Sequence, residues 1–101
     1  MNIDLYKNFD DKIKKIWIDF EKKADMTPFQ SFDLIYHWYE SIGKPLFKIK
    51  LKIFHVYNSK GTVAILPLSI RNSFGFKILE WIGLYQSDYM GPLFLKDYKN
   101  N

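Results

Sequence analysis

The fold of this chain is decided by the stretch Ile49-Lys50-Leu51-Lys52-Ile53-Phe54-His55-Val56, in which apolar residues recur at every second position. A period of two is typical of a β-strand, whose side chains point alternately to opposite faces of a sheet. Lysines fill the alternate positions up to Lys52. Phe54 and Val56 then place apolar groups on the face that the lysines occupied. We therefore expect this strand to enter the hydrophobic core along its length.

Two turns follow this strand and predict a three-stranded antiparallel meander. Residues 58–61 (Asn-Ser-Lys-Gly) and 72–75 (Asn-Ser-Phe-Gly) have the composition of hairpin turns. The strands that they delimit are expected over Thr62–Arg71 and Phe76–Gly83, with a further short strand over Met90–Leu95. Pro67 cannot donate a hydrogen bond, so it marks a bulge or a locally unpaired stretch.

The residues before Pro45 follow a helical period instead. Between Asp10 and Ala24 charged residues cover most of a helix whose one apolar face comprises Ile13, Ile16, Trp17, Phe20 and Ala24. Asp10 or Asp11 is the expected cap of this helix. A second helix is predicted to begin at Ser31 and to end at Gly43 in a left-handed conformation. Its expected buried stripe comprises Leu34, Ile35, Trp38, Tyr39 and Ile42. The predicted fold class is α+β, two N-terminal helices followed by an antiparallel β-meander, in a single domain over residues 1–101.

Composition excludes several classes of protein. Fifteen Lys and Arg against eleven Asp and Glu give a net charge of +4, but Arg71 is the one arginine, and sequence-specific nucleic-acid readers usually rely on arginine. The chain has no cysteine, hence no disulfide or thiolate metal site. No segment has the run of about 20 apolar residues that a membrane span needs, so a cytoplasmic location is the default. Aromatic residues make up 19%, and some should line a groove or an interface.

Side chains that carry chemistry are few and scattered. His37 and His55 are the only histidines, and neither has His, Asp or Glu neighbours at the spacing of a metal site, so structural roles are favoured for both. No serine lies in a Gly-x-Ser-x-Gly elbow, and the glycines do not match a phosphate-binding loop. Lys48, Lys50 and Lys52 form a positive row that can attract phosphate or an anionic polymer. The solvated side of an edge strand also explains that row, and this interpretation is favoured.

The segment Trp81–Phe94 begins within the pattern of the third strand and then loses its period. Trp81 shares a face of that strand with Leu79 and Lys77. The segment combines aromatic residues, glycines and a proline with one carboxylate, Asp88. A partly buried Asp beside tyrosines can hold a sugar hydroxyl or an amine, or act as a base if desolvation raises its pKa. Ser87 and Asp88 can also satisfy backbone donors in an ordinary turn, which the spacing alone favours slightly.

Several segments, taken in order, resemble the N-terminal part of bacterial GNAT-superfamily acyltransferases. The most similar group is related to the Fem-type aminoacyltransferases and to acetyltransferases associated with cellulose and exopolysaccharide synthesis. The resemblance runs from about Phe9 to Phe94. The segments that carry it are Trp17, Pro28–Ser31, Trp38, Ala64–Leu68, Phe76–Gly83 and Ser87–Leu93.

This resemblance implies acyl transfer to an amine or hydroxyl of a cell-envelope or polysaccharide precursor. Members of the family have two GNAT-like halves, and acyl-CoA binds largely to the C-terminal half. The Gln/Arg-x-x-Gly-x-Gly/Ala loop that binds pyrophosphate in many GNAT proteins has no counterpart here. We therefore expect an N-terminal fragment or short homologue that holds no cofactor itself and needs a C-terminal GNAT-like half and acetyl-CoA or another acyl donor. The expected substrate-binding residues are Trp81, Gln86, Ser87, Asp88 and Tyr89.

Two other interpretations remain open. The chain can be a non-catalytic module in which Trp81, Tyr85 and Tyr89 form a stacking platform for carbohydrate, or less readily for single-stranded nucleic acid. It can also be an orphaned fragment whose aromatic residues need a partner domain, in which case the isolated chain should self-associate.

Overall fold

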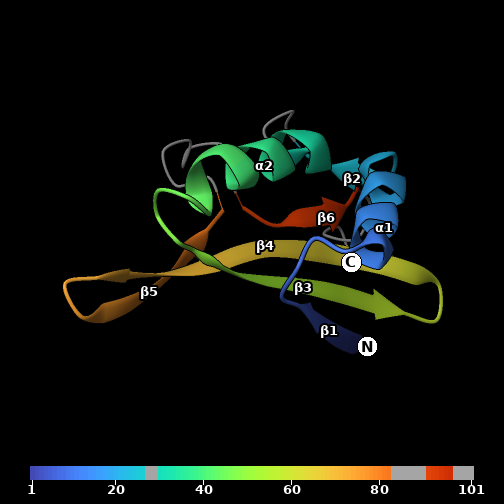
Figure 1. Cartoon of the computed structure of the whole chain (residues 1–101). Coiled ribbons are helices and arrows are strands. Elements are labelled where there is room, and N and C mark those ends of the chain that lie inside the picture. The colour runs from blue at the N-terminus through green and yellow to red at the C-terminus, as the bar shows by residue number, and fades with distance from the viewer. Residues whose placement is uncertain (27–29, 83–90, 97–101) are drawn as a thin grey trace.

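The alternating stretch around Ile53 forms one of the two long central strands of an antiparallel sheet. A computed structural model describes residues 1–26, 30–82 and 91–96. In these parts of the chain the strands are β1 (Asn2–Tyr6), β2 (Ala24–Asp25), β3 (Lys50–Asn58), β4 (Gly61–Ser73), β5 (Phe76–Trp81) and β6 (Leu93–Leu95). The helices are α1 (Asp11–Glu21), α2 (Phe32–Trp38) and a π-helical turn, η2 (Tyr39–Gly43). The helices lie over one face of the sheet, so the fold is a two-layer α+β arrangement (Figure 1).

The meander predicted from the hairpin turns is confirmed, and three more strands extend the sheet. β3, β4 and β5 pair in succession, each antiparallel to the next. β1 was not predicted, and it pairs with β3 so that Asp4 lies opposite His55. β2 was also missed, because two residues are too few to show a period; it pairs with β6, which in turn pairs with β4. The chain therefore begins with a strand and not with a helix.

Pro67 lies where the sheet divides, as the missing donor predicted. One edge of β4 pairs with β6 through Ala64 and Ile65 and with β5 from Leu68 onward, which leaves Pro67 between the two partners. The Pro67 carbonyl accepts a hydrogen bond from the Ile82 amide at 2.9 Å. Because the N–H and C=O of a strand residue point to the same side, the absent N–H of Pro67 would face this gap and not β3. The missing N–H of Pro67 therefore removes no hydrogen bond from the ladder between β3 and β4.

The helix starts are confirmed, whereas the predicted ends and stripe need correction. Asp10 Oδ1 accepts from the Ile13 amide at 2.9 Å, and Ser31 Oγ accepts from the Leu34 amide at 3.3 Å, so both residues cap their helices. α1 ends at Glu21 and not at Ala24, because Ala24 pairs with β6. Leu34 was expected in the buried stripe but is 40% exposed.

Gly43 ends the helical segment through close packing and not through a left-handed conformation. It has no positive φ, which contradicts the prediction. The Trp38 ring lies over it, and a Cβ placed on Gly43 would lie 2.6 Å from Trp38 Cζ3 and 3.0 Å from Ile49 Cδ1. Glycine is required here because no side chain fits beneath the indole.

The core lies between the helices and the sheet. Trp17 is fully buried on α1, as predicted, and Trp38 is partly buried against the core and stacks on Phe47. Several aromatic rings gather around Phe9, which lies tilted against Trp17 and meets the rings of Phe32, Tyr36 and Tyr39 edge to face. The buried core residues are Ile13, Trp17, Phe20, Ala24, Phe32, Ile35, Ile49, Leu51, Ile53, Ile65, Ile82 and Leu93.

The opposite side of the sheet, which we call the outer face, is apolar as well, and no described helix covers it (Figure 1). Leu79 is 59% exposed and Phe94 43%. Phe54 and Val56 are only partly buried there, so the expectation that β3 enters the core along its length is wrong. Strand pairing and alternation place on this face Ile3, Leu5, Phe54, Val56, Ala64, Leu66, Leu68, Ile70, Leu79, Trp81 and Phe94.

We expect Gly43→Ala to lower the free energy of unfolding by about 1–3 kcal/mol, the usual cost of forcing extra volume into a packed site. Urea denaturation measures this change. Ser41→Ala is the matched control, since Ser41 is exposed in the same turn η2 and its replacement should change stability by less than about 0.5 kcal/mol. Equal stability of the two variants would contradict the packing role of Gly43.

Candidate functional site

Of the residues predicted to bind a substrate, Trp81 is the one that the structure describes. It ends β5 opposite Leu68 and is partly buried. It shares the outer face with Leu79 and Lys77, as the alternation predicted. The other predicted residues lie outside the described ones: Gln86, Ser87, Asp88 and Tyr89, as does Tyr85 of the stacking platform.

Described residues anchor both flanks of the segment that carries these predicted residues. On one side, the Ile82 side chain is fully buried and its amide is bonded to Pro67. On the other side, Gln30 Nε2 donates to the carbonyl oxygens of Gly91 and Pro92 at 3.1 and 3.2 Å. The Gln30 main-chain oxygen accepts from Trp17 Nε1 at 3.1 Å. Gln30 is 6% exposed, so these bonds are shielded from water.

Sequence reasoning quoted Gln30 only as part of the resemblance and assigned it no role. Its contacts reach residues 61 and 62 positions away, so no local pattern indicates them. A glutamine one residue before the predicted start of a helix is unremarkable in composition. Its burial is the signal, and burial depends on the tertiary fold.

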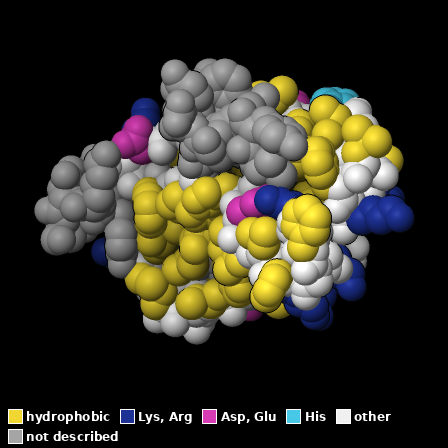
Figure 2. Space-filling model, turned by 90° about the vertical axis from the view of Figure 1, so that its left-hand side faces the viewer, with side chains coloured by type: hydrophobic (Ala, Val, Ile, Leu, Met, Phe, Trp, Pro, Cys, Tyr) yellow, Lys and Arg dark blue, Asp and Glu magenta, His cyan; other side chains and the backbone are white. Residues whose placement is uncertain are grey.

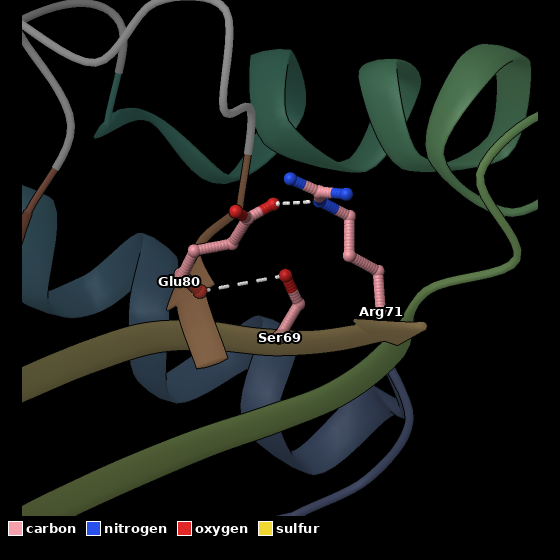
Figure 3. Close-up of polar contacts among 3 residues, drawn as sticks. All are labelled: Ser69, Arg71 and Glu80. Atoms are coloured by element: carbon pink, nitrogen blue, oxygen red, sulfur yellow. Dashed lines mark hydrogen bonds and ion pairs between the residues drawn. The ribbon is translucent and has the colours of Figure 1, made fainter. Parts of the chain in front are cut away.

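Ser69, Arg71 and Glu80 form a polar cluster on the helix-covered face of the sheet (Figure 3). Arg71 Nε donates to Glu80 Oε2 at 2.8 Å, and Ser69 Oγ donates to the Glu80 main-chain oxygen at 3.4 Å. The side chains of Arg71 and Glu80 are 27% and 21% exposed. Figure 3 shows both extending from the sheet toward α2. Sequence reasoning did not predict this cluster, because pairing Arg71 with Glu80 requires the register of the second hairpin.

The chemistry available to this cluster is recognition more than acid–base catalysis. The Glu80 carboxylate is already engaged in a charge-assisted hydrogen bond with the Arg71 guanidinium. The Ser69 hydroxyl donates to a carbonyl and has no base beside it among the described contacts, so it is not activated as a nucleophile. The guanidinium has further N–H groups beyond Nε, and these can bind an anionic group.

The lysine row lies on the outer face, at one end of the sheet. Lys50 and Lys52 belong to β3, and β1 pairs with β3 only from Ile53 onward, so this stretch is an edge of the sheet. The structure adds Lys77 of β5 to the row, which alternation along one strand could not reveal.

Hydrophobic side chains cover much of the end of the molecule at which β5 lies (Figure 2).

His55 belongs to a second set of polar side chains and is buried at the end of the sheet near β1. Its Nε2 lies 2.8 Å from Thr62 Oγ1, and its ring stacks on Tyr57 with centroids 4.8 Å apart. Nδ1 is buried with no hydrogen-bond partner among the described residues. Burial lowers the pKa of His55 below 6.5, opposed by the nearby Asp4 carboxylate and assisted by Lys12. These contacts support the structural role that the sequence favoured.

His37 is exposed on α2, against the ring of Tyr36. Within the described ranges, no three His, Cys, Asp or Glu side chains come together as a metal ion would require. No helix among those residues is long and apolar enough to cross a membrane.

Comparison of the chain with protein-family models, with curated proteins and with solved structures finds no match. Arguments about function therefore depend on the residues themselves and on how the fold arranges them.

We expect stability to fall as the pH drops below about 6.5, in part because of His55. Its pKa is lowered in the folded chain, so the unfolded chain binds this proton more readily and acid favours unfolding; the contribution is fully present above the unfolded pKa. His55→Gln should reduce the loss of stability between pH 7.5 and 5.5, measured by urea denaturation. His37→Gln, at an exposed position, should leave the pH dependence unchanged. An unaltered pH profile for His55→Gln would contradict this account.

Proposed function

We propose that this chain is the acceptor-binding part of an acyl-CoA-dependent acyltransferase of the GNAT superfamily that modifies a cell-envelope or polysaccharide precursor. A second, GNAT-like half supplies the site for acetyl-CoA or another acyl donor. Because acyl-CoA is an intracellular metabolite, the proposal includes a cytoplasmic location. The chain alone is not a complete catalyst.

The observation that carries this proposal is the outer face. A sheet needs cover on an apolar face, and stable domains usually bury such faces against another layer. Here side chains such as Leu79 and Phe94 remain exposed over several strands, more than isolated surface residues would explain. A second structural unit against this sheet would bury them, as a two-half acyltransferase requires.

The placement of the resembling segments also supports the proposal. Ala64–Leu68 lies in β4 and Phe76–Trp81 forms β5, so two of these segments are neighbouring strands. Trp17 and Trp38 belong to the helical layer above them. Trp81 stands where β5 ends, just before the predicted acceptor-binding residues. Its ring is partly accessible on the outer face, where a sugar ring can stack.

A second candidate is a non-catalytic carbohydrate-binding module. It is favoured by Trp81 sharing the outer face with the partly exposed rings of Phe54 and Phe94. Under this alternative, polysaccharides should change the tryptophan fluorescence of the isolated chain. Trp17 is fully buried, which limits its response, and a flat titration would remove the alternative.

An acyl-transfer assay tests the leading proposal. The tagged full chain, purified from its own cells with its bound partners, is supplied with labelled acetyl-CoA and an extract of envelope and polysaccharide precursors. Label should enter the precursor fraction. Trp81→Ala should lower kcat/KM about three- to tenfold, because ring stacking contributes roughly 0.5–1.5 kcal/mol.

Phe76→Ala is the matched control, since it truncates an exposed ring on the same strand, on the opposite face from Trp81. It should keep the activity of the unsubstituted protein. Equal activity of Trp81→Ala, or no transfer above a mock purification, would contradict the proposal. A rise in Tm of the isolated chain with acetyl-CoA that inorganic diphosphate does not reproduce would contradict the assignment of the cofactor site to a second half, because only ligands of the folded state raise stability.

A further inference from the structure

The outer face carries a hollow of about 180 Å³ between β3, β4 and β5. We call it the lysine hollow. Its lining residues are Lys48, Lys50, Lys52, Ile70, Asn72 and Lys77.

Strand pairing explains how this set converges. Lys50 lies opposite Ile70 on β4, and Asn72 of the same strand lies opposite Lys77 on β5. β4 is the middle strand, so lysines from β3 and β5 flank it at a spacing of about 4.8 Å per strand. The long lysine side chains can therefore bring their ammonium groups together over Ile70 and Asn72.

Within the part of the chain that the structure describes, no acid lines the hollow, so no carboxylate in its lining neutralises its lysines. Among the described residues the ion pair is that of Arg71 and Glu80, which lies on the opposite face of the sheet. Edge protection accounts for each lysine taken separately, because Lys50 and Lys52 occupy an unpaired edge of β3, and β5, which carries Lys77, pairs with β4 alone. It does not account for lysines of both strands meeting around one hollow.

The backbone at Lys48 is a second, independent observation. Lys48 has a φ of 53°, in the left-handed region that a long side chain rarely adopts. Such a conformation is strained for a residue other than glycine and is often found where function requires a particular side-chain position. Here the strained residue contributes one wall of the hollow.

We propose that the lysine hollow binds the diphosphate group of a ligand. A single phosphomonoester carries a charge of only about −1.5 to −2 at pH 7 and would leave about half of the four lysine charges unbalanced. A diphosphate carries more charge on two adjacent groups, and Asn72 offers amide donors between them. Leu79 and Trp81 continue the same face, so the group attached to the diphosphate lies over apolar and aromatic side chains. This inference does not depend on acyl transfer.

NMR titration of the full chain with inorganic diphosphate tests the inference. The amide signals of Ile70, Asn72 and Lys77 should shift and saturate, whereas those of α1 should not. Calorimetry should show roughly tenfold weaker binding of orthophosphate, and weaker binding of both at higher salt. Diphosphate affinity equal to that of orthophosphate, or shifts spread over all lysine-bearing surfaces, would overturn the proposal.

Matched charge variants give the second test. Lys50→Gln/Lys52→Gln/Lys77→Gln should weaken diphosphate binding at least about tenfold. The control Lys14→Gln/Lys15→Gln/Lys22→Gln removes the same charge from exposed positions on and beside α1 and should keep the affinity. Equal losses in both variants would reduce the effect to net charge and overturn the proposal. Tighter binding of a single-stranded oligonucleotide than of diphosphate would also overturn it, in favour of a polynucleotide surface.

Discussion

The buried side-chain amide of Gln30 is the contact on which the arrangement of this chain depends. Its two N–H bonds hold the main chain at Gly91 and Pro92, and the main-chain carbonyl of the same residue accepts a hydrogen bond from the Trp17 indole. Each bond pairs a polar group that would otherwise be buried without a partner. A buried polar group left unpaired destabilises the folded state by about 1–3 kcal/mol. One residue thereby ties α1, the start of α2 and the chain leading into β6 to a common core.

These Gln30 contacts determine which face of the sheet stays accessible for function. Because the helices and the chain around Pro92 pack on one face, the polar cluster of Arg71 and Glu80 lies on the side of α2 and is only partly exposed. The other face keeps its apolar side chains, Trp81 and the lysine hollow accessible. An apolar surface bordered by a cluster of lysines is suited to a partner and an anionic ligand more than to solvent alone.

Features that arise from neighbouring residues could be predicted from the sequence. The caps at Asp10 and Ser31, the two hairpins and the gap at Pro67 follow from local chemistry, and the structure confirms them. Features that join distant residues could not be predicted. β1 has an alternating pattern, but its partner lies some 50 positions away, so the pattern alone does not show that it pairs. Gly43 was misjudged because glycine serves close packing as well as left-handed turns, and only the Trp38 ring distinguishes the two.

In the candidate site, too, local features could be predicted from the sequence and long-range features could not. Alternation along β5 correctly placed Trp81 with Leu79 and Lys77, but the contribution of Lys77 to a hollow with the β3 lysines depends on the register of two hairpins. Gln86–Tyr89 lie outside the described residues and stay a prediction.

Hydrogen exchange in Gln30→Met and Gln30→Glu tests the central claim most directly. Both variants remove the bonds to Gly91 and Pro92, and the glutamate adds repulsion between its carboxylate and two carbonyl oxygens. Amide exchange in β6 should accelerate at least about tenfold, since each lost bond leaves a buried carbonyl unpaired. Exchange at Ile53 in the centre of β3 should rise less, and the glutamate should have the larger effect. Unchanged exchange in β6, or an equal rise at Ile53, would contradict the role assigned to Gln30.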